Sequence, residues 1–253
     1  MRVTFLGTGT SQGVPVINCN CSVCNSLDYR DKRLRSSIHI EAEGKSFIID
    51  SGPDFRQQVL ANQITTLDAL IFTHQHKDHI AGMDDVRGFN FSQQKDMPVF
   101  ASAQVIAQLK QEFAYVFAAD KYPGVPRVVV HEIDNHAFKA EGVEFTPIEV
   151  MHYKLPVFGY RVGSFTYITD AKTIAEEEKD KIRGSEVLVL NALQHKQHIS
   201  HLNLKESLQL IEELQPRQAF LTHISHNLGA YQDVSKLLPS HVSLAYDGLS
   251  IEI

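Results

Sequence analysis

The chain has 253 residues, of which 43% are hydrophobic, so it can bury a full core, and we expect one domain over residues 1–253. Its formal net charge of −6, with acids and bases interspersed, argues against a general electrostatic grip on nucleic acid. No apolar run approaches the roughly 20 residues of a membrane span, and no basic leader precedes the first apolar run, so a cytoplasmic protein without a membrane partner is expected.

Short apolar runs between turn residues predict a series of strands. In chain order they are Val3–Leu6, Ser37–Ala42, Phe47–Asp50, Ala69–Thr73, Val99–Ala101, Val128–His131, Val143–Val150, Phe158–Val162, Phe165–Thr169, Val187–Leu190, Ala219–Thr222, Ser243–Ala245 and Leu249–Glu252. The dipeptides Glu43-Gly44 and Gly163-Ser164 are typical of hairpin turns.

Helical periodicity appears in several stretches between these strands. The clearest helix begins after Asn203, which can cap it together with Glu206 in the reciprocal position. Its apolar stripe consists of Leu204, Leu208, Ile211 and Leu214. A second helix is predicted to begin at Thr173, with Glu176 three residues later. Strands mixed with amphipathic helices predict an α/β (α+β) protein built as a four-layer αββα sandwich.

Polar residues stand where several of the predicted strands end. They are Asp50, Thr73, Thr169-Asp170, Asn191 and Thr222-His223. Loops held by rigid strands are the usual place for catalytic groups, so these strand ends predict one shared site along a sheet edge.

The segment Thr73–His79, with the sequence Thr-His-Gln-His-Lys-Asp-His, follows the apolar strand Leu70–Phe72. It contains three imidazoles and one carboxylate, from His74, His76, His79 and Asp78. Four polar side chains so close together would gain nothing in an ordinary loop, but they are the ligand types that bind zinc or manganese. Four ligands are too few for two ions. The strand ends supply three further candidates, which are His152, Asp170 and His223. Asp50 is placed to accept a hydrogen bond from a ligand histidine and orient it.

The remaining histidines lack this context. His39, His131, His136, His195 and His241 are therefore expected to be ordinary surface residues.

The only three cysteines, Cys19, Cys21 and Cys24, fall within six residues of one another. Three closely spaced cysteines cannot all pair in disulfides within the chain, but they can bind a metal ion. A fourth ligand would complete a tetrahedral structural zinc site. Three ordinary thiols in a reducing compartment are the alternative.

These motifs together resemble those of the metallo-β-lactamase superfamily. The nearest resemblance is to the cyclic phosphodiesterases of the carbon–phosphorus lyase pathway, which hydrolyse phosphoribosyl 1,2-cyclic phosphate. The ribonuclease Z group, which matures tRNA 3′ ends, is a more distant relative. Besides the histidine and cysteine motifs, the shared features are Gly7-Thr8-Gly9, Gln12–Pro15, Ile49-Asp50, Phe158-Gly159-Tyr160, Leu221–His226 and Asp247-Gly248.

The resemblance implies the metallo-β-lactamase fold and two divalent ions, Zn²⁺ or Mn²⁺, at the active site. One ion would be held by His74, His76 and His152, the other by Asp78, His79 and His223, with Asp170 bridging both. A bridging hydroxide would attack phosphorus. The resemblance also implies that His226 is the fourth ligand of the cysteine site, which would bind a third, structural Zn²⁺.

The leaving alkoxide needs a proton, and the loop His198–Asn203 offers candidate acids. His201 fits the ribonuclease Z motif, in which a histidine just precedes the capped helix, so we expect His201 to act with Asp78 in catalysis. His198 is the alternative acid, and a plain helix-entry loop is the third interpretation.

We expect a phosphodiesterase acting on a small phosphodiester, with a cyclic ribose phosphate among the candidates. The resemblance to the ribonuclease Z group implies a tRNA-gripping arm between the positions of His152 and Asp170. The 17 residues between them leave no room for such an arm, so a tRNA 3′-processing nuclease is disfavoured. Thioester or lactone hydrolysis needs the same metals and stays open, as does a metal-binding regulatory module without turnover. The resemblance is compatible with a homodimer.

Overall fold

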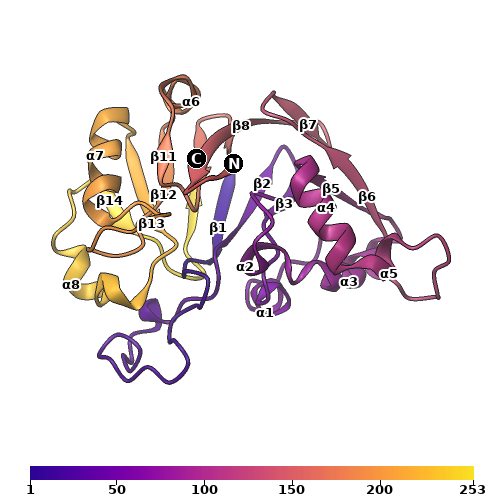
Figure 1. Ribbon diagram of the computed structural model, residues 1–253, viewed down its shortest axis with the longest axis horizontal. Coiled ribbons are helices and arrows are strands. Elements are labelled where there is room, and N and C mark those ends of the chain that lie inside the picture. Colours follow the sequence, from indigo (N-terminus) through magenta and orange to yellow (C-terminus); the bar gives the residue numbers. More distant parts are fainter.

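Two mixed β-sheets lie face to face at the centre of the computed structural model, which describes residues 1–253 (Figure 1). The first sheet has the order β15 (Ser250–Glu252), β1 (Arg2–Gly7), β2 (Ser37–Ala42), β3 (Lys45–Ile49), β4 (Ala69–Ile71), β5 (Met97–Ala101) and β6 (Val128–Glu132). The second has the order β11 (Thr173–Ile174), β8 (Val143–His152), β9 (Leu155–Val162), β10 (Phe165–Ile168), β12 (Val187–Asn191), β13 (Gln218–Thr222) and β14 (Val242–Leu244), and β7 (Phe138–Ala140) pairs with β8.

Helices cover the outer face of each sheet (Figure 1). Those beside the first sheet are α1 (Phe55–Ala61), α2 (Lys77–Ile80), α3 (Arg87–Gln93), α4 (Ala103–Glu112) and α5 (Ala114–Phe117). Those beside the second are α6 (Glu176–Ile182), α7 (Leu204–Leu214) and α8 (Tyr231–Ser235). Short 3₁₀ turns are η1 (Tyr29–Asp31), η2 (Met83–Val86) and η3 (His226–Leu228). The predicted αββα sandwich is confirmed.

Strand β3 shows how the sequence builds these layers. Its side chains alternate between the two faces of the sheet, as the twofold repeat of a strand requires. Phe47 and Ile49 belong to the core between the sheets, whereas Ile48 belongs to the core under α1–α5. Because both faces of the strand are buried there, residues Phe47–Ile49 are apolar without interruption.

Parallel pairing brings the strand ends together. Strands β3, β4, β5 and β6 are parallel in the first sheet, and β10, β12, β13 and β14 are parallel in the second. Ligands of open α/β sheets bind beyond the carboxyl ends of such strands. Asp50 follows β3, Asp170 lies just beyond β10, and His223 follows β13, so these residues meet at one edge.

Two sequence predictions are wrong, and two short strands were not predicted. Thr173 does not begin a helix, because it pairs with Met151 in β11 and α6 begins at Glu176. The short strands β7 and β11 were not predicted. His39 is not a surface residue, since it is 7% exposed and hydrogen-bonds Ser46. The capping box of Asn203 and Glu206 is present as predicted.

None of the helices is long and apolar enough to cross a bilayer.

Candidate metal centre

Three residues of the site have left-handed backbone conformations. Asp50, Asp170 and His223 have φ of 64°, 59° and 54°, a region that costs a non-glycine residue about 1 kcal/mol or more. Each comes at the end of a strand and is buried, so the surrounding sheets hold it in place. Strain of this kind is concentrated at functional sites, because it turns side chains toward a shared point.

His79 lies at the centre of the carboxylates. Its Nδ1 is 2.7 Å from Asp50 Oδ2, and Asp50 in turn accepts a hydrogen bond from the backbone N–H of Thr73. Its Nε2 is 3.2 Å from Asp78 Oδ2 and 3.4 Å from Asp170 Oδ2, yet it has no partner with hydrogen-bond geometry. An orphaned buried nitrogen that faces carboxylate oxygens fits a cation between them.

His74, His76 and His152 form the neighbouring group. His74 Nε2 is 3.0 Å from His76 Nδ1, and the rings of His76 and His152 are 5.1 Å apart. His152 Nδ1 is 2.9 Å from the carbonyl oxygen of Ser200, which orients the ring by a hydrogen bond to its other nitrogen. These three side chains therefore converge as a set of nitrogen donors.

Asp170 joins the groups to one another. It belongs to all three buried clusters that could hold an ion, which are His74–His79–Asp170, His152–Asp170–His201 and Asp78–Asp170–His223. Its Oδ2 is 3.3 Å from His223 Nδ1, and its Oδ1 is 3.1 Å from His201 Nε2. Asp170 thus has the central position that a bridging ligand requires.

The charges of the buried groups do not balance without cations. Burial lowers the pKa of His79, but the carboxylates of Asp170, Asp50 and Asp78 outweigh it and raise that pKa well above its usual value. Burial lowers the pKa of His223 to about 4 and that of His74 well below its usual value.

Three carboxylates therefore meet one imidazole whose protonation they favour. Divalent cations would compensate this excess of negative charge, and the nitrogen and oxygen donors suit them.

His201 and His198 lie beside this cluster. His201 Nε2 faces Asp170, whereas its Nδ1 is 3.0 Å from Ser200 Oγ and 3.2 Å from His198 Nδ1. The ring of His201 stacks on that of His223, with 4.9 Å between centroids. Both candidate acids are thus in one loop, with His201 nearer to the carboxylates.

Sequence reasoning missed two hydroxyls that hold His223. Thr10 Oγ1 is 3.3 Å from His223 Nε2, and Ser36 Oγ is 3.1 Å from His223 Nδ1. Ser36 also donates to the carbonyl oxygen of Gly9. Gly9 belongs to the Gly7-Thr8-Gly9 motif that the chain shares with the superfamily, and that motif was the one signal in the sequence near these contacts.

The three cysteines and His226 form a second, separate cluster. His226 Nδ1 is 3.2 Å from Cys19 Sγ and 3.4 Å from the Sγ atoms of both Cys21 and Cys24. A tetrahedral zinc ion has ligand atoms about 3.5 Å apart, which follows from its bond lengths. The N–H of Cys24 donates to Cys21 Sγ and is the largest influence that lowers the pKa of Cys21 to about 6. The cluster fits a structural zinc ion.

Comparison with known proteins identifies the family. The model of the beta-lactamase superfamily domain matches residues 45–224. The crystal structure of a diphosphatase from the PhnP family is 38% identical in sequence, covers 100% of this chain and 97% of its own, and superposes with a TM-score of 0.93. The chain belongs to this superfamily and, within it, to the PhnP family. Its fold is the metallo-β-lactamase fold, and its His/Asp clusters could hold metal ions.

Two further similar proteins differ in how much of their length this chain matches and in sequence identity. An octanoyltransferase from Porphyromonas gingivalis is 37% identical over 252 residues, which are 98% of this chain but 51% of that protein. The chain therefore spans about half the length of this curated relative. Human tRNase Z in its short form is 17% identical, covers 100% of this chain and 99% of its own, and has a TM-score of 0.71, which shows a shared fold.

Proposed function

We propose that this chain hydrolyses phosphodiester bonds in small molecules, using two divalent ions held by the His/Asp clusters. The observation that carries the proposal is the central position of Asp170, which belongs to all three buried clusters. Two bound ions would polarise the phosphoryl oxygens and lower the pKa of a water between them. Zn²⁺ and Mn²⁺ both suit these nitrogen and oxygen ligands.

The side chains of the protein would supply the remaining steps. Asp50 orients His79 through the 2.7 Å contact between Asp50 Oδ2 and His79 Nδ1, and Ser200 orients His152. His201 Nε2 faces the carboxylate of Asp170. From this position His201 would donate a proton to the leaving oxygen of the substrate. Phosphoryl transfer depends mainly on such positioning and charge stabilisation, so a rigid, buried site suits it.

The short segment between His152 and Asp170 supports a small substrate. Strands β8 and β9 are joined directly by the two-residue turn Tyr153-Lys154, and no arm extends from it. Together with the net charge of −6, this favours a small molecule over a tRNA. Cyclic ribose phosphates are the first substrates to test.

A second candidate is hydrolysis of a diphosphate, which the 38% identical diphosphatase favours. Attack on phosphorus at a two-ion site is common to both reactions, and the leaving group is a phosphate in place of an alkoxide. The octanoyltransferase name belongs to a protein of which this chain matches half, so it does not assign acyl transfer to this site.

The decisive experiment is a turnover screen of the protein loaded with Mn²⁺ or Zn²⁺. We expect hydrolysis of bis(p-nitrophenyl) phosphate and of a cyclic ribose phosphate. Asp170→Asn should abolish it, whereas a change at the exposed His136, His136→Ala, should have no effect. Turnover of thioesters or lactones but of no phosphodiester or diphosphate would overturn the proposal.

A further inference from the structure

The hairpin turn beside the metal cluster differs from the other hairpin turns of the chain. Four hairpins have two-residue turns, and three of these turns contain glycine: Glu43-Gly44, Glu141-Gly142 and Gly163-Ser164. The fourth, Tyr153-Lys154, does not. Tyr153 nevertheless has a φ of 57°, a conformation that disfavours an aromatic residue.

The two ends of strand β9 make this comparison direct. At one end, Gly163 has a φ of 56° and is followed by Ser164; at the other, Tyr153 takes the same left-handed place and is followed by Lys154. Glycine would satisfy the backbone at either end. Glu43 and Glu141 hold this first turn position with φ of 52° and 50°, so a left-handed residue other than glycine is not unique to Tyr153. What distinguishes this turn is an aromatic side chain at that position and no glycine beside it.

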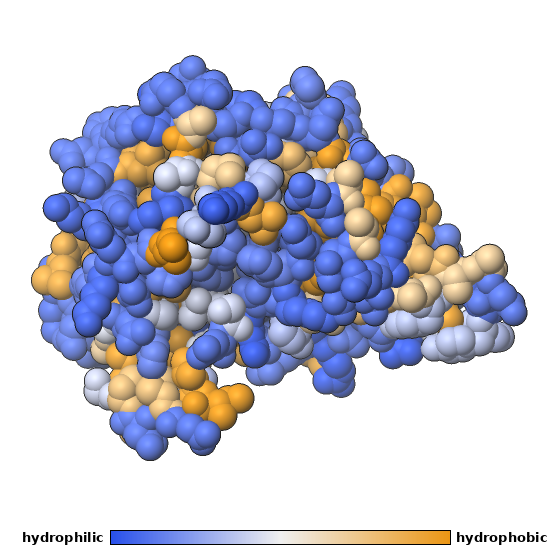
Figure 2. Space-filling view, viewed as in Figure 1, coloured by the Kyte–Doolittle hydropathy of each residue, from blue (hydrophilic) through white to orange (hydrophobic).

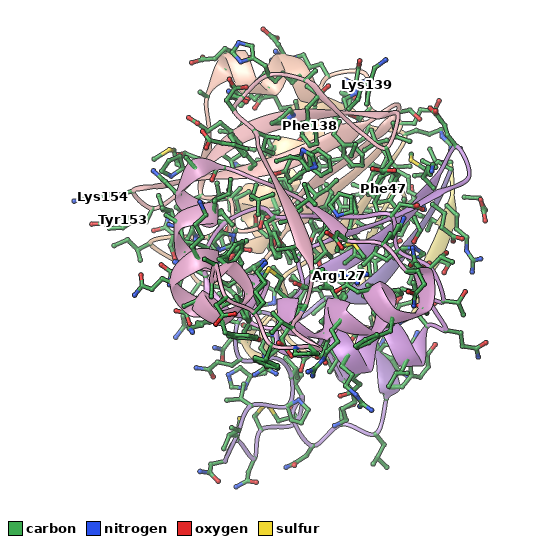
Figure 3. All side chains as sticks on the ribbon, turned by 90° about the vertical axis from the view of Figure 1, so that its right-hand side faces the viewer. Phe47, Arg127, Phe138, Lys139, Tyr153 and Lys154 are labelled. Atoms are coloured by element: carbon green, nitrogen blue, oxygen red, sulfur yellow. The ribbon has the colours of Figure 1, made fainter.

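The turn lies next to the metal cluster. Tyr153 directly follows His152, whose ring is 5.1 Å from His76 and 4.5 Å from His201 between centroids. Tyr153 is 52% exposed, and Lys154 Nζ lies 5.3 Å from the centroid of its ring. Both side chains project from the edge of the molecule in Figure 3, so they can meet a ligand that enters from solvent.

An exposed ring paired with an ammonium group has a definite chemistry. A tyrosine face stacks on planar aromatic groups such as nucleobases, and a lysine is a point charge for a phosphate. We propose that the Tyr153–Lys154 turn positions the non-reacting side of the substrate, and that this side carries a nucleoside whose base stacks on Tyr153. The ammonium group of Lys154, beside that ring, would attract the anionic substrate to the turn without contacting the reacting phosphate. This assignment presupposes the phosphodiester hydrolysis proposed above.

Two esters that release the same leaving group test it. Thymidine 5′-monophosphate p-nitrophenyl ester and methyl p-nitrophenyl phosphate break the same kind of bond, but only the first carries a nucleoside. We expect the Mn²⁺-loaded protein to have a KM about tenfold lower for the thymidine ester. Tyr153→Gly should raise that KM about tenfold, leave its kcat within about twofold, and leave the methyl ester unaffected, because one base stack is lost.

Further variants distinguish a loss of substrate binding from a change in the stability of the protein. Tyr153→Phe keeps the ring and should behave as the unchanged protein, and Lys154→Ser should raise KM for the thymidine ester without affecting its kcat. Tyr153→Gly should melt at the same temperature or higher, since glycine relieves the left-handed conformation. Tyr122→Ala removes another exposed tyrosine, in the loop after α5, and is the matched control.

Binding of thymidine 5′-monophosphate, measured by calorimetry, gives an independent result. It should be about tenfold weaker in Tyr153→Gly. Equal loss on both esters, or unchanged binding of the nucleotide in Tyr153→Gly, would overturn the assignment. Absence of turnover of both esters with nucleotide binding still dependent on Tyr153 would instead contradict the hydrolysis proposal and leave the nucleoside site standing.

Discussion

His201 has its two ring nitrogens in different surroundings. Nε2 faces Asp170 Oδ1 at 3.1 Å, and Nδ1 faces Ser200 and His198. Only Nε2 is therefore placed to give a proton to an oxygen that leaves from the carboxylate cluster. His198 lies behind His201 on the Nδ1 side, so the geometry favours His201 of the two acids that the sequence left open.

A general acid is recognised by the dependence of its effect on the leaving group. For a cyclic ribose phosphate, whose leaving alkoxide is strongly basic, we expect His201→Ala to lower kcat by about 10²- to 10⁴-fold. For bis(p-nitrophenyl) phosphate, whose leaving group needs little protonation, the loss should be less than about tenfold. Initial rates on both substrates with the same bound metal make the comparison.

His198→Ala is the control for this prediction, and it should change both rates by less than about tenfold. If His201→Ala slowed both substrates equally, His201 would be acting on the metal site and not on the leaving group.

At the scale of elements, helix α2 carries two of the candidate ligands, Asp78 and His79, and its position depends on glycines. A Cβ added to Gly82 would lie 2.2 Å from the carbonyl oxygen of Gly52 and 2.7 Å from Phe55 Cβ. The N–H of Gly82 also donates to the carbonyl oxygen of Ser51 at 2.8 Å. The end of α2 thus packs directly on the segment after β3, which brings His79 to Asp50.

We predict that Gly82→Ala lowers the free energy of unfolding by about 1–3 kcal/mol, because backbone would have to move to admit the methyl group. The measurement is the urea unfolding midpoint with a chelator present, so that metal loss does not contribute. Gly88→Ala is the matched control: no atom lies within 4 Å of its added Cβ in helix α3, and it should stabilise by about 0.5–1 kcal/mol. Equal effects of the two changes would contradict this account of α2.

The elements that the sequence predicted well are those with strong local signals. Strand β3 is apolar on both faces, and α7 has both a stripe and a capping box. Strands β7 and β11 are short edge pieces whose pairing with β8 gives no local pattern. Thr173 carried a capping pattern, but its pairing with Met151 overrode that local preference.

In the candidate site, too, the residues with a local sequence signal were predicted, and those that depend on distant contacts were not. Asp50, Asp170 and His223 could be found because each ends an apolar strand. Thr10 and Ser36 could not, because their contacts with His223 join residues 213 and 187 positions apart and depend on how the sheets pack. The division of the ligands between two ions remains a prediction.

At the scale of the whole molecule, the N-terminal loop between β1 and β2 has little core of its own. Its hydrophobic cluster contains three buried residues, Val14, Val23 and Cys24. Exposed apolar side chains, among them Ile17 and Leu27, are on this loop, and apolar atoms gather on the protrusion at the lower left of Figure 2. So small a core cannot fix a segment of this length, which suggests that the cysteine cluster anchors it.

We predict that a zinc ion ties this loop to His226, which is 202–207 residues away from the cysteines in the sequence. Elemental analysis of the zinc-loaded protein should find three ions per chain, and Cys21→Ser should retain two, because the His/Asp clusters are separate. The variant should melt at a lower temperature, since the loop loses its anchor.

The control is Asn20→Ser, which changes the neighbouring side chain without removing a thiolate and should keep all three ions. An unchanged zinc count in Cys21→Ser would show that the cysteines are ordinary thiols, and the loop would then be held without a metal, by the packing of Val14 and Val23 and by hydrogen bonds such as that from the N–H of Tyr231 to Asp31.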